Sequence, residues 1–347
     1  MAEQANQVTA GERVKIERLG ATAAKVRGEL RKKIVGLDLV VEQMLMAIFA
    51  GGHSLLVGVP GLAKTLLISS LAEILSLKFR RIQFTPDLMP SDITGTEVIA
   101  QDRETGKRVF QFVPGPIFAH LVLADEINRT PPKTQAALME AMEERQVTSA
   151  GKKFPLEPPF HVLATQNPIE QEGTYPLPIA QLDRFMFELR VDYPSFEEEY
   201  KIAALTTSAY KAELSPLIAR EEILDLQAIV KKLPVSETVI RYAAQIVRHT
   251  RVQSDSAPKF IRDWLLWGVG PRGGQFLILA AKARAMLEGR ATVEPADIRA
   301  VAHPVLRHRI ISSYYAEAEG ITPDRIVAKL LEVVPAPDAR IGVGAGV

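Results

Sequence analysis

The periodicity of hydrophobic and polar positions differs between the first and the second half of the chain. In the first half, short apolar runs are separated by segments of helical periodicity, which is typical of a parallel sheet with crossover helices. The run Leu121–Ala124 is apolar at every position, as expected for a strand that is covered on both faces. The expected strands are Ser54–Val57, Arg81–Phe84, Leu121–Ala124, His161–Thr165 and Met186–Val191.

Two segments interrupt this rhythm and predict β-hairpins. Between about residues 86 and 116, and again between about 145 and 159, two strand-like runs flank a polar or glycine-containing turn. Both hairpins are therefore expected as insertions in the α/β part of the chain. Their expected strands are Glu97–Ala100 with Val109–Phe112, and Gln146–Ser149 with Lys153–Leu156.

From about residue 193 the pattern becomes helical. Ser195 precedes three acids, Glu197–Glu199, which is typical of a helix start. The predicted organisation is an α/β domain at residues 1–192, which begins with helices, and an all-α domain at residues 193–347 with a flexible tail. Five prolines divide this second domain into helices: Pro216, Pro234, Pro258, Pro271 and Pro295.

Composition narrows the class of protein without naming a partner. The 347 residues are 47% hydrophobic and 24% charged, and 42 basic against 41 acidic side chains leave a formal net charge of +1. This balance gives no reason to expect nucleic acid or a membrane surface as partner. Absence of cysteine excludes disulfides, thiolate catalysis and cysteine-ligated zinc. Because no apolar run has signal-peptide or membrane-spanning length, we expect a cytoplasmic protein without membrane insertion.

The turn after the first expected strand carries a phosphate-loop pattern. Gly58–Thr65 nearly matches G-x-x-x-x-G-K-[ST], whose backbone N–H groups, lysine and hydroxyl hold a triphosphate and its Mg²⁺. Ala63 replaces the second glycine, and we expect a negative φ there because a positive φ would exclude alanine. The alternative is an ordinary strand–turn–helix. The predicted nucleotide-binding residues of this turn are Gly58, Val59, Pro60, Gly61, Leu62, Ala63, Lys64, Thr65 and Leu66.

A second pattern favours the phosphate interpretation. His120–Glu126 is an apolar run that ends in two acids, and the carboxyl end of a parallel strand faces the crevice where α/β sheets bind ligands. Asp125 is expected to hold Mg²⁺ together with Thr65. Glu126 is expected to polarise the water that attacks the γ-phosphate of ATP. The alternative, two solvated acids at a helix start, is disfavoured by the joint occurrence with Lys64 and Thr65.

Further polar residues lie at strand or helix ends. Asn167 follows the strand expected beside Asp125, where an amide can orient the attacking water; the alternative is an Asn-Pro turn. Arg184 precedes the last expected strand. It is either a structural ion-pair member or a group that serves a phosphate in a neighbouring subunit. Arg145 is a weaker candidate for such a contact.

Five segments, in this order, resemble the MoxR family of AAA+ ATPases, in the branch with a hairpin inserted in helix 2. The resemblance spans roughly residues 14–335. It implies an α/β P-loop core with a parallel five-stranded sheet in the order 5-1-4-3-2, an all-α helical lid, and assembly into a ring, usually a hexamer. The segments are Gly58–Thr65, Leu121–Thr148 (LVLADEINRTPPKTQAALMEAMEERQVT), Ala164–Pro168 (ATQNP), Thr174–Phe185 (TYPLPIAQLDRF) and Gly270–Arg272 (GPR).

The resemblance also implies a role for each motif residue. Two glycines, Gly273 and Gly274, follow the lid motif and are expected to loosen the start of its helix. Ile179 stands where the family commonly has an acid. The implied roles are Walker A for Lys64 and Thr65, Walker B for Asp125 and Glu126, sensor 1 for Asn167, an arginine finger acting in trans for Arg184, sensor 2 for Arg272, and the adenine wall for Val35 and Gly36.

By the same resemblance, ATP hydrolysis is expected to drive chaperone-like maturation of partner complexes, often with metal cofactor insertion, alongside von Willebrand factor A-domain proteins. One alternative is a nucleic-acid motor, for which basic hairpin residues would line a pore. Arg103, Lys107 and Arg108 suggest it, as do Lys152–Lys153, but nearby acids offset them. The other alternative is a nucleotide-binding scaffold without turnover.

Overall fold

A parallel five-stranded sheet forms the centre of the first half of the chain. The structure is a computed structural model and describes residues 8–59, 61–101, 108–169, 173–208 and 212–337. The sheet runs in the order β2-β5-β8-β1-β9, with parallel pairing throughout. Counted along the core strands this is 5-1-4-3-2, so the predicted order is confirmed. The bounds are Ser54–Gly58 (β1), Phe79–Gln83 (β2), Leu121–Asp125 (β5), His161–Gln166 (β8) and Phe187–Val191 (β9).

Helices cover both faces of this sheet, because successive strand residues are apolar and point to opposite faces. On β1, Leu55 packs in a cluster with α5, whereas Leu56 packs in a second cluster with α1, α2 and α3. Thr9 begins α1 with a capping box, and Gly51 ends α2 in a left-handed conformation. The helices are α1 (Ala10–Leu30), α2 (Asp38–Ala50), α3 (Lys64–Ile74), α5 (Pro132–Glu144) and α6 (Ile179–Leu182), with a 3-10 turn at Ile127–Arg129.

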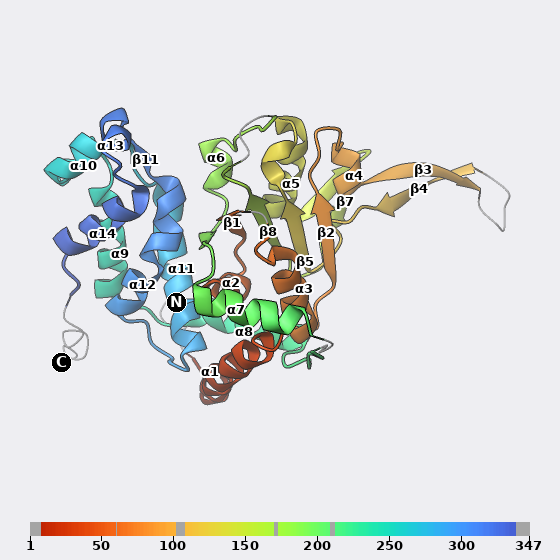
Figure 1. The fold of residues 1–347 in the computed structure, drawn as a ribbon, viewed down its shortest axis with the longest axis horizontal. Helices are drawn as coiled ribbons and strands as arrows, with labels where there is room; N and C mark the ends of the chain where they lie inside the picture. The colour runs from red at the N-terminus through yellow and green to blue at the C-terminus, as the bar shows by residue number, and fades with distance from the viewer. Residues whose placement is uncertain (1–7, 60, 102–107, 170–172, 209–211, 338–347) are drawn as a thin grey trace.

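Two antiparallel hairpins lie where the sequence predicts them. The first, β3–β4, follows the short helix α4 and projects far from the body of the molecule (Figure 1). Phe112 of this hairpin stacks on Phe154 of the second hairpin, with ring centroids 3.9 Å apart. This contact anchors the base of the long hairpin. The bounds are Pro90–Thr94 (α4), Gly95–Gln101 (β3), Arg108–Pro114 (β4), Gln146–Ser149 (β6) and Lys152–Pro155 (β7).

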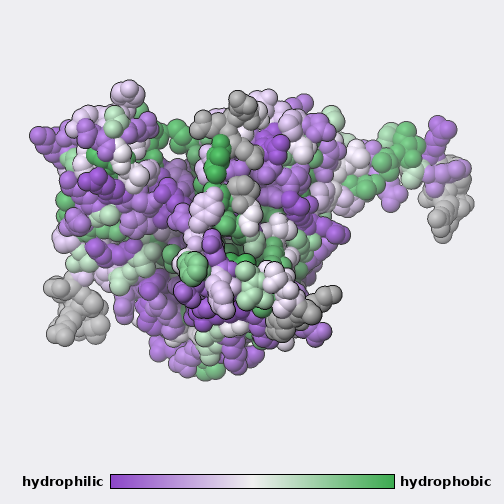
Figure 2. Space-filling model, viewed as in Figure 1, coloured by the Kyte–Doolittle hydropathy of each residue, from purple (hydrophilic) through white to green (hydrophobic). Residues whose placement is uncertain are grey.

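The projecting hairpin carries apolar side chains in solvent. Ile99 and Phe110 lie opposite each other in the β3–β4 register and are 63% and 71% exposed. Figure 2 shows apolar residues along the same projection. Exposed apolar side chains that lie together on a projecting ribbon make this hairpin a candidate contact surface.

The second half of the chain is helical. A short antiparallel strand pair, β10 with β11, is the one addition that the sequence patterns do not predict for the described residues. The buried residues of this helical half form one cluster with those of α1 and α2, so the helical lid packs on the N-terminal helices. The domain boundary at residue 193 stays a prediction. The bounds are Phe196–Thr206 (α7), Arg220–Lys232 (α8), Glu237–His249 (α9), Lys259–Trp264 (α10), Leu265–Trp267 (β10), Pro271–Leu287 (α11), Pro295–Leu306 (α12), Arg307–Arg309 (η3), Ile311–Ser312 (β11), Tyr314–Ala318 (α13) and Pro323–Val333 (α14).

None of the described helices combines the length and the apolar composition needed to cross a lipid bilayer.

A buried carboxylate joins two of the lid helices. Asp297 near the start of α12 is fully buried, and its Oδ1 lies 2.5 Å from guanidinium nitrogens of both Arg284 and Arg290. Its Oδ2 accepts the backbone N–H of Glu294 at 2.8 Å. The desolvation cost of this carboxylate is therefore offset only while both arginines and the helix cap remain in place.

Removal of this carboxylate should destabilise the lid strongly. We expect Asp297→Ala to lower the free energy of unfolding by about 3 kcal/mol, because two partly buried arginines lose one of their carboxylate partners and the backbone N–H of Glu294 loses its acceptor. Urea titration followed by tryptophan fluorescence measures this, since both tryptophans of the chain, Trp264 and Trp267, lie in the lid. Asp225→Ala removes an exposed carboxylate from Lys15 and should leave the midpoint unchanged. Equal effects of the two variants would contradict the prediction.

Candidate functional site

A crevice of about 460 Å³ lies at the carboxyl edge of the sheet. Lys64, the first residue of α3, donates from Nζ to the carbonyl oxygen of Gly58 at the end of β1. Burial lowers the pKa of the Lys64 ammonium, while Asp125 and Glu126 oppose that shift. The ammonium is thus held directly at the mouth of the turn. The crevice is lined by Gly61, Leu62, Ala63, Lys64, Thr65, Leu66, Arg81, Asp125, Glu126, Thr165 and Asn167.

The expected negative φ of Ala63 is wrong. Ala63 has φ 51° and ψ 24°, in the left-handed region, directly before α3. Gly61 is also left-handed, with φ 84°, so the loop reverses direction twice between β1 and the helix. Position 63 is the turn residue before the helix rather than its first residue, and alanine occupies it at a cost of about 1–2 kcal/mol. Pro60 lies outside the described residues.

Asp125 is fixed at the end of β5 by two neighbouring strands. Its Oδ1 accepts the Thr165 hydroxyl of β8 at 2.6 Å, and its Oδ2 accepts from Arg81 of β2 at 2.7 Å. The backbone N–H of Glu126 donates to the same Thr165 hydroxyl at 2.8 Å. The first acid therefore has one defined orientation into the crevice. Thr165 and Arg81 were not singled out from the sequence.

Glu126 also takes a left-handed conformation, with φ 57°. Its Oε2 accepts from Gln83 Nε2 at 2.8 Å and from Arg129 Nη1 at 2.9 Å. Gln83 ends the edge strand β2, which is separated by two strands from β1, the strand before the phosphate turn, and its side chain holds this carboxylate. Sequence inspection missed Gln83 because a polar residue at a strand end resembles an ordinary surface position.

Asn167 follows β8 and is 6% exposed at the wall of the crevice. Its Oδ1 accepts the backbone N–H of Ile169 at 3.1 Å, which fixes the side chain across the Asn-Pro turn. Asn167 therefore forms the Asn-Pro turn and also lines the crevice, and its role in orienting water stays a prediction.

A second, more apolar cavity of about 520 Å³ continues the crevice. It shares Gly61, Leu62, Ala63 and Leu66 with the crevice, and its far wall includes Val35 and Gly36. Ile202 and Ala203 of α7 close another side. A flat apolar group attached to a polyanion would fit these two joined spaces.

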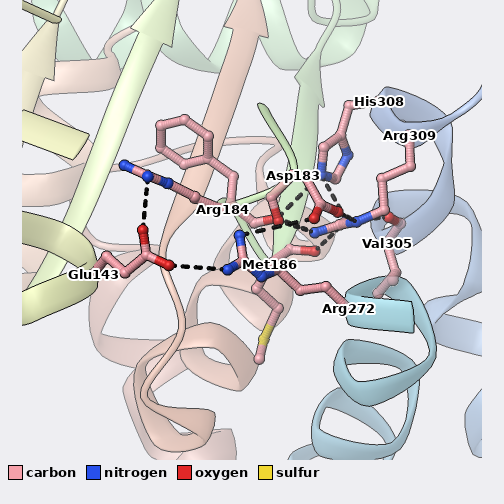
Figure 3. A network of polar contacts seen from close by, with 9 residues as sticks. Glu143, Asp183, Arg184, Met186, Arg272, Val305, His308 and Arg309 are labelled. Atoms are coloured by element: carbon pink, nitrogen blue, oxygen red, sulfur yellow. Dashed lines mark hydrogen bonds and ion pairs between the residues drawn. The ribbon is translucent and has the colours of Figure 1, made fainter. Parts of the chain in front are cut away.

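Arg184 and Arg272 meet at a third cavity, of about 190 Å³. Glu143, near the end of α5, accepts from Arg184 Nη2 at 2.7 Å through Oε2 and from Arg272 Nη2 at 3.1 Å through Oε1 (Figure 3). Arg145 lines the same cavity but donates to the carbonyl oxygens of Gly51 and Phe160, which makes it a structural member. We call Glu143, Arg184 and Arg272 the arginine cluster.

The arginine cluster lies at the amino edge of the sheet, opposite the crevice. Its cavity is lined by residues that precede β1 and β9, whereas the crevice residues follow β1, β5 and β8. β1 has five residues, which makes it roughly 15 Å long. The structure places Arg272, the expected sensor 2 residue, beside Arg184, and neither residue lines the crevice of its own chain.

Ala63 offers a direct test of the loop geometry. Ala63→Gly should raise the free energy of unfolding by roughly 0.5–1 kcal/mol, because the relief of left-handed strain exceeds the added entropy of the unfolded chain. Ala72→Gly, in the right-handed interior of the same helix α3, should lower it by about 1 kcal/mol or more. Chemical denaturation of both variants measures the difference. Destabilisation of equal size in both would contradict the left-handed assignment.

Comparisons with known sequences agree with this geometry. A sequence model of the ATPase family associated with various cellular activities (AAA) matches residues 53–187. A second model, of the AAA lid domain, matches residues 263–330. The first match contains every residue of the crevice, and the second contains Arg272.

Several full-length relatives are similar over nearly the whole chain. Chaperone MoxR1 of Mycobacterium tuberculosis is 42% identical over 317 residues, which cover 90% of this chain and 81% of that protein. YeaC of Bacillus subtilis, an uncharacterized protein, is 43% identical over 94% of this chain and 98% of its own length. A crystal structure of a candidate ATPase from Cytophaga hutchinsonii superposes with a TM-score of 0.85 at 40% identity, covering 93% of this chain and 97% of that chain. The chain therefore belongs to the MoxR family of AAA+ ATPases.

Proposed function

We propose that this chain binds ATP in the crevice and hydrolyses it to remodel partner proteins as a chaperone. The observation that carries the proposal is the convergence of the turn before α3, the acids that follow β5 and the amide that follows β8 on one crevice. The backbone N–H groups at the start of α3, together with Lys64, suit a triphosphate. The adjoining apolar cavity, with Val35 and Gly36, suits an adenine ring.

Hydrolysis then follows from the arrangement of the polar side chains. Glu126 acts as the base that orients and deprotonates water, and Gln83 and Arg129 hold its carboxylate in position. Asn167 orients the same water from the neighbouring strand. Lys64 stabilises the charge that develops on the γ-phosphate oxygens.

The donor set also fits Mg²⁺. The Thr65 hydroxyl and the Asp125 carboxylate line the same crevice, and Mg²⁺ prefers oxygen ligands of this kind. When bound, Mg²⁺ would neutralise part of the negative charge on the phosphates. Thr165 keeps the Asp125 carboxylate in the orientation that such binding requires.

Arg184 and Arg272 serve the nucleotide of a neighbouring subunit in this proposal. They lie at the amino edge of the sheet, about one strand length from the crevice of their own chain, which exceeds the reach of an arginine side chain. A head-to-tail contact places the amino edge of one copy on the carboxyl edge of the next, and such contacts close into rings. We propose a hexamer.

The projecting hairpin is the proposed client contact. Ile99 and Phe110 are exposed and apolar, which favours binding of apolar protein segments over nucleic acid. The tip residues Arg103 and Lys107, on which the nucleic-acid motor alternative depends, lie outside the described residues. A von Willebrand factor A-domain partner, metal cofactor insertion and a cytoplasmic location remain part of the proposal through the family.

Two substitutions in the crevice should affect ATP binding and ATP hydrolysis differently. Glu126→Gln should retain ATP affinity but lose phosphate release by at least about 10²-fold, because the amide cannot act as a base. Lys64→Ala should lose binding itself, because the phosphates lose their ammonium partner. Calorimetry and a phosphate-release assay measure the two properties. Near-normal turnover in Glu126→Gln would remove its catalytic role, and unimpaired affinity in Lys64→Ala would overturn the phosphate-loop assignment.

Mixing experiments should reveal catalysis between subunits. Arg184→Ala has an intact crevice and Glu126→Gln an intact arginine cluster, so mixed rings contain some complete interfaces. We expect each variant alone to be inactive and the mixture to recover part of the ATPase rate. Should every mixing ratio stay inactive while rings still form, the trans role of Arg184 would be refuted.

A further inference from the structure

Behind the arginine cluster lies a buried arginine to which no role has been assigned. Arg309, in the 3-10 turn η3 of the lid, is 3% exposed. Its Nε donates to the carboxylate of Asp183 at 2.8 Å, and its Nη2 donates to the backbone carbonyls of Asp183 and Phe185 at 2.8 and 2.6 Å. These groups lie immediately before and after Arg184 (Figure 3). A lid residue thus holds the backbone on both sides of the proposed finger.

Such a burial is costly unless the guanidinium is fully partnered. Desolvation lowers the pKa of Arg309 to about 10, and the Asp183 carboxylate opposes that shift. The side chain therefore stays protonated at neutral pH and needs acceptors for its planar set of donors. The carbonyl of Val305 on α12 takes a further donor from Nη1, so the same group also ties the turn to the lid helix.

The glycine after Arg272 makes room for this side chain. A Cβ at position 273 would lie 2.2 Å from Val269 Cγ1 and 3.2 Å from Arg309 Cδ. Phe276, one turn later on α11, lies under the Arg309 guanidinium at 5.0 Å from ring centroid to Cζ. The helix α11 begins at Pro271 and runs through both glycines. Gly273 therefore permits close packing against both Val269 and Arg309, and the expected loosening of the helix start stays a prediction.

Arg272 completes the link between lid and core. Its Nη1 lies 3.7 Å from Asp183 Oδ2, while its Nη2 bonds Glu143, the carboxylate that also holds Arg184. Two core acids are thus each shared with lid arginines. Any shift of α11 and η3 relative to the core must displace the turn that carries Arg184.

We propose that Arg309 is a positioning residue that transmits the position of the lid to Arg184, and so sets whether a subunit can complete the active site of its neighbour. This inference rests on the proposed trans role of Arg184. Arg309 itself touches neither the crevice nor any reacting atom of its own chain.

The first measurement separates turnover from nucleotide affinity. We expect Arg309→Met to lower kcat by about 10–10²-fold, because a displaced finger loses its alignment with the γ-phosphate. ATP affinity, measured with a fluorescent analogue, should change by less than about twofold, since the crevice is remote. Arg309→Lys keeps the charge but not the fork of donors, and should recover only part of kcat. Arg299→Met, which removes a lid arginine that donates to Tyr242 and to the carbonyl oxygen of Leu331, is the matched control and should keep kcat.

The second measurement asks which half of the interface is defective. Arg309→Met mixed with Glu126→Gln should recover activity, because one partner supplies the crevice and the other supplies a well-placed finger. Arg309→Met mixed with Arg184→Ala should show no activity beyond the residual rate of Arg309→Met, because both partners then lack a well-placed finger. A general loss of lid structure would not produce this one-sided pattern.

Three results would overturn the inference. The first is a wild-type kcat in Arg309→Met, and the second is recovery of activity when Arg309→Met is mixed with Arg184→Ala. The third is no recovery when Arg309→Met is mixed with Glu126→Gln, although the reference mixture of Arg184→Ala with Glu126→Gln does recover. Failure of that last reference mixture would instead refute the trans role of Arg184 itself. If Arg309→Met does not fold, Asp183→Asn tests the same point, because it keeps the shape of the acceptor but removes its charge. It should show the same one-sided pattern with a smaller loss of kcat, and a symmetric pattern would refute the proposal.

Discussion

The parallel pairing of β1 with β8 and β9 is the constraint on which the two functional regions depend. Parallel strands send all their carboxyl ends to one edge of the sheet and all their amino ends to the other. The phosphate turn, Asp125 and Asn167 therefore gather at one edge, while Arg184 lies at the opposite edge. No rearrangement of side chains within one subunit can bring the two sets together. Under the proposed function, the topology of the sheet therefore assigns Arg184 to the crevice of a neighbouring subunit.

The lid connects the two edges of the sheet mechanically. Its apolar residues pack in one cluster with α1 and α2, and its arginines Arg272 and Arg309 bind the core acids Glu143 and Asp183 at the amino edge. The lid is therefore bonded to the edge of the sheet that the proposal assigns to a neighbouring subunit. The same apolar cluster also supports α3, whose first turn is the proposed phosphate site. Events at one crevice can thus reach the next through a continuous packed body, because a close-packed core transmits displacement.

Sequence patterns identified the strands and the phosphate loop because these features are local. Apolar runs, the turn before Lys64 and the acids after β5 each lie within a few residues, and the sheet order followed from the family resemblance. Residues that act across the fold carried no such signal. Gln83 and Arg309 belong to stretches that look like an ordinary strand end and a basic helix end, and their roles arise from partners 43 and 126 residues away. The position of Arg272 beside Arg184 likewise depends on how the lid docks, which no local pattern encodes. The φ of Ala63 failed because a turn residue was taken as the first residue of the helix.

Residues with strained backbone conformations occur both at the crevice and beside the arginine cluster. Among the described residues, five non-glycine residues have positive φ, and three of them are Ala63, Glu126 and Arg145. Each costs about 1–2 kcal/mol and reverses the chain within a single residue. Ala63 lets Lys64 begin a helix directly at the end of the phosphate loop, and Arg145 ends α5 two residues after Glu143. A longer, relaxed turn would place these charged groups on flexible loops. The strain is therefore the structural consequence of holding these charged groups on rigid elements at the two edges of one sheet.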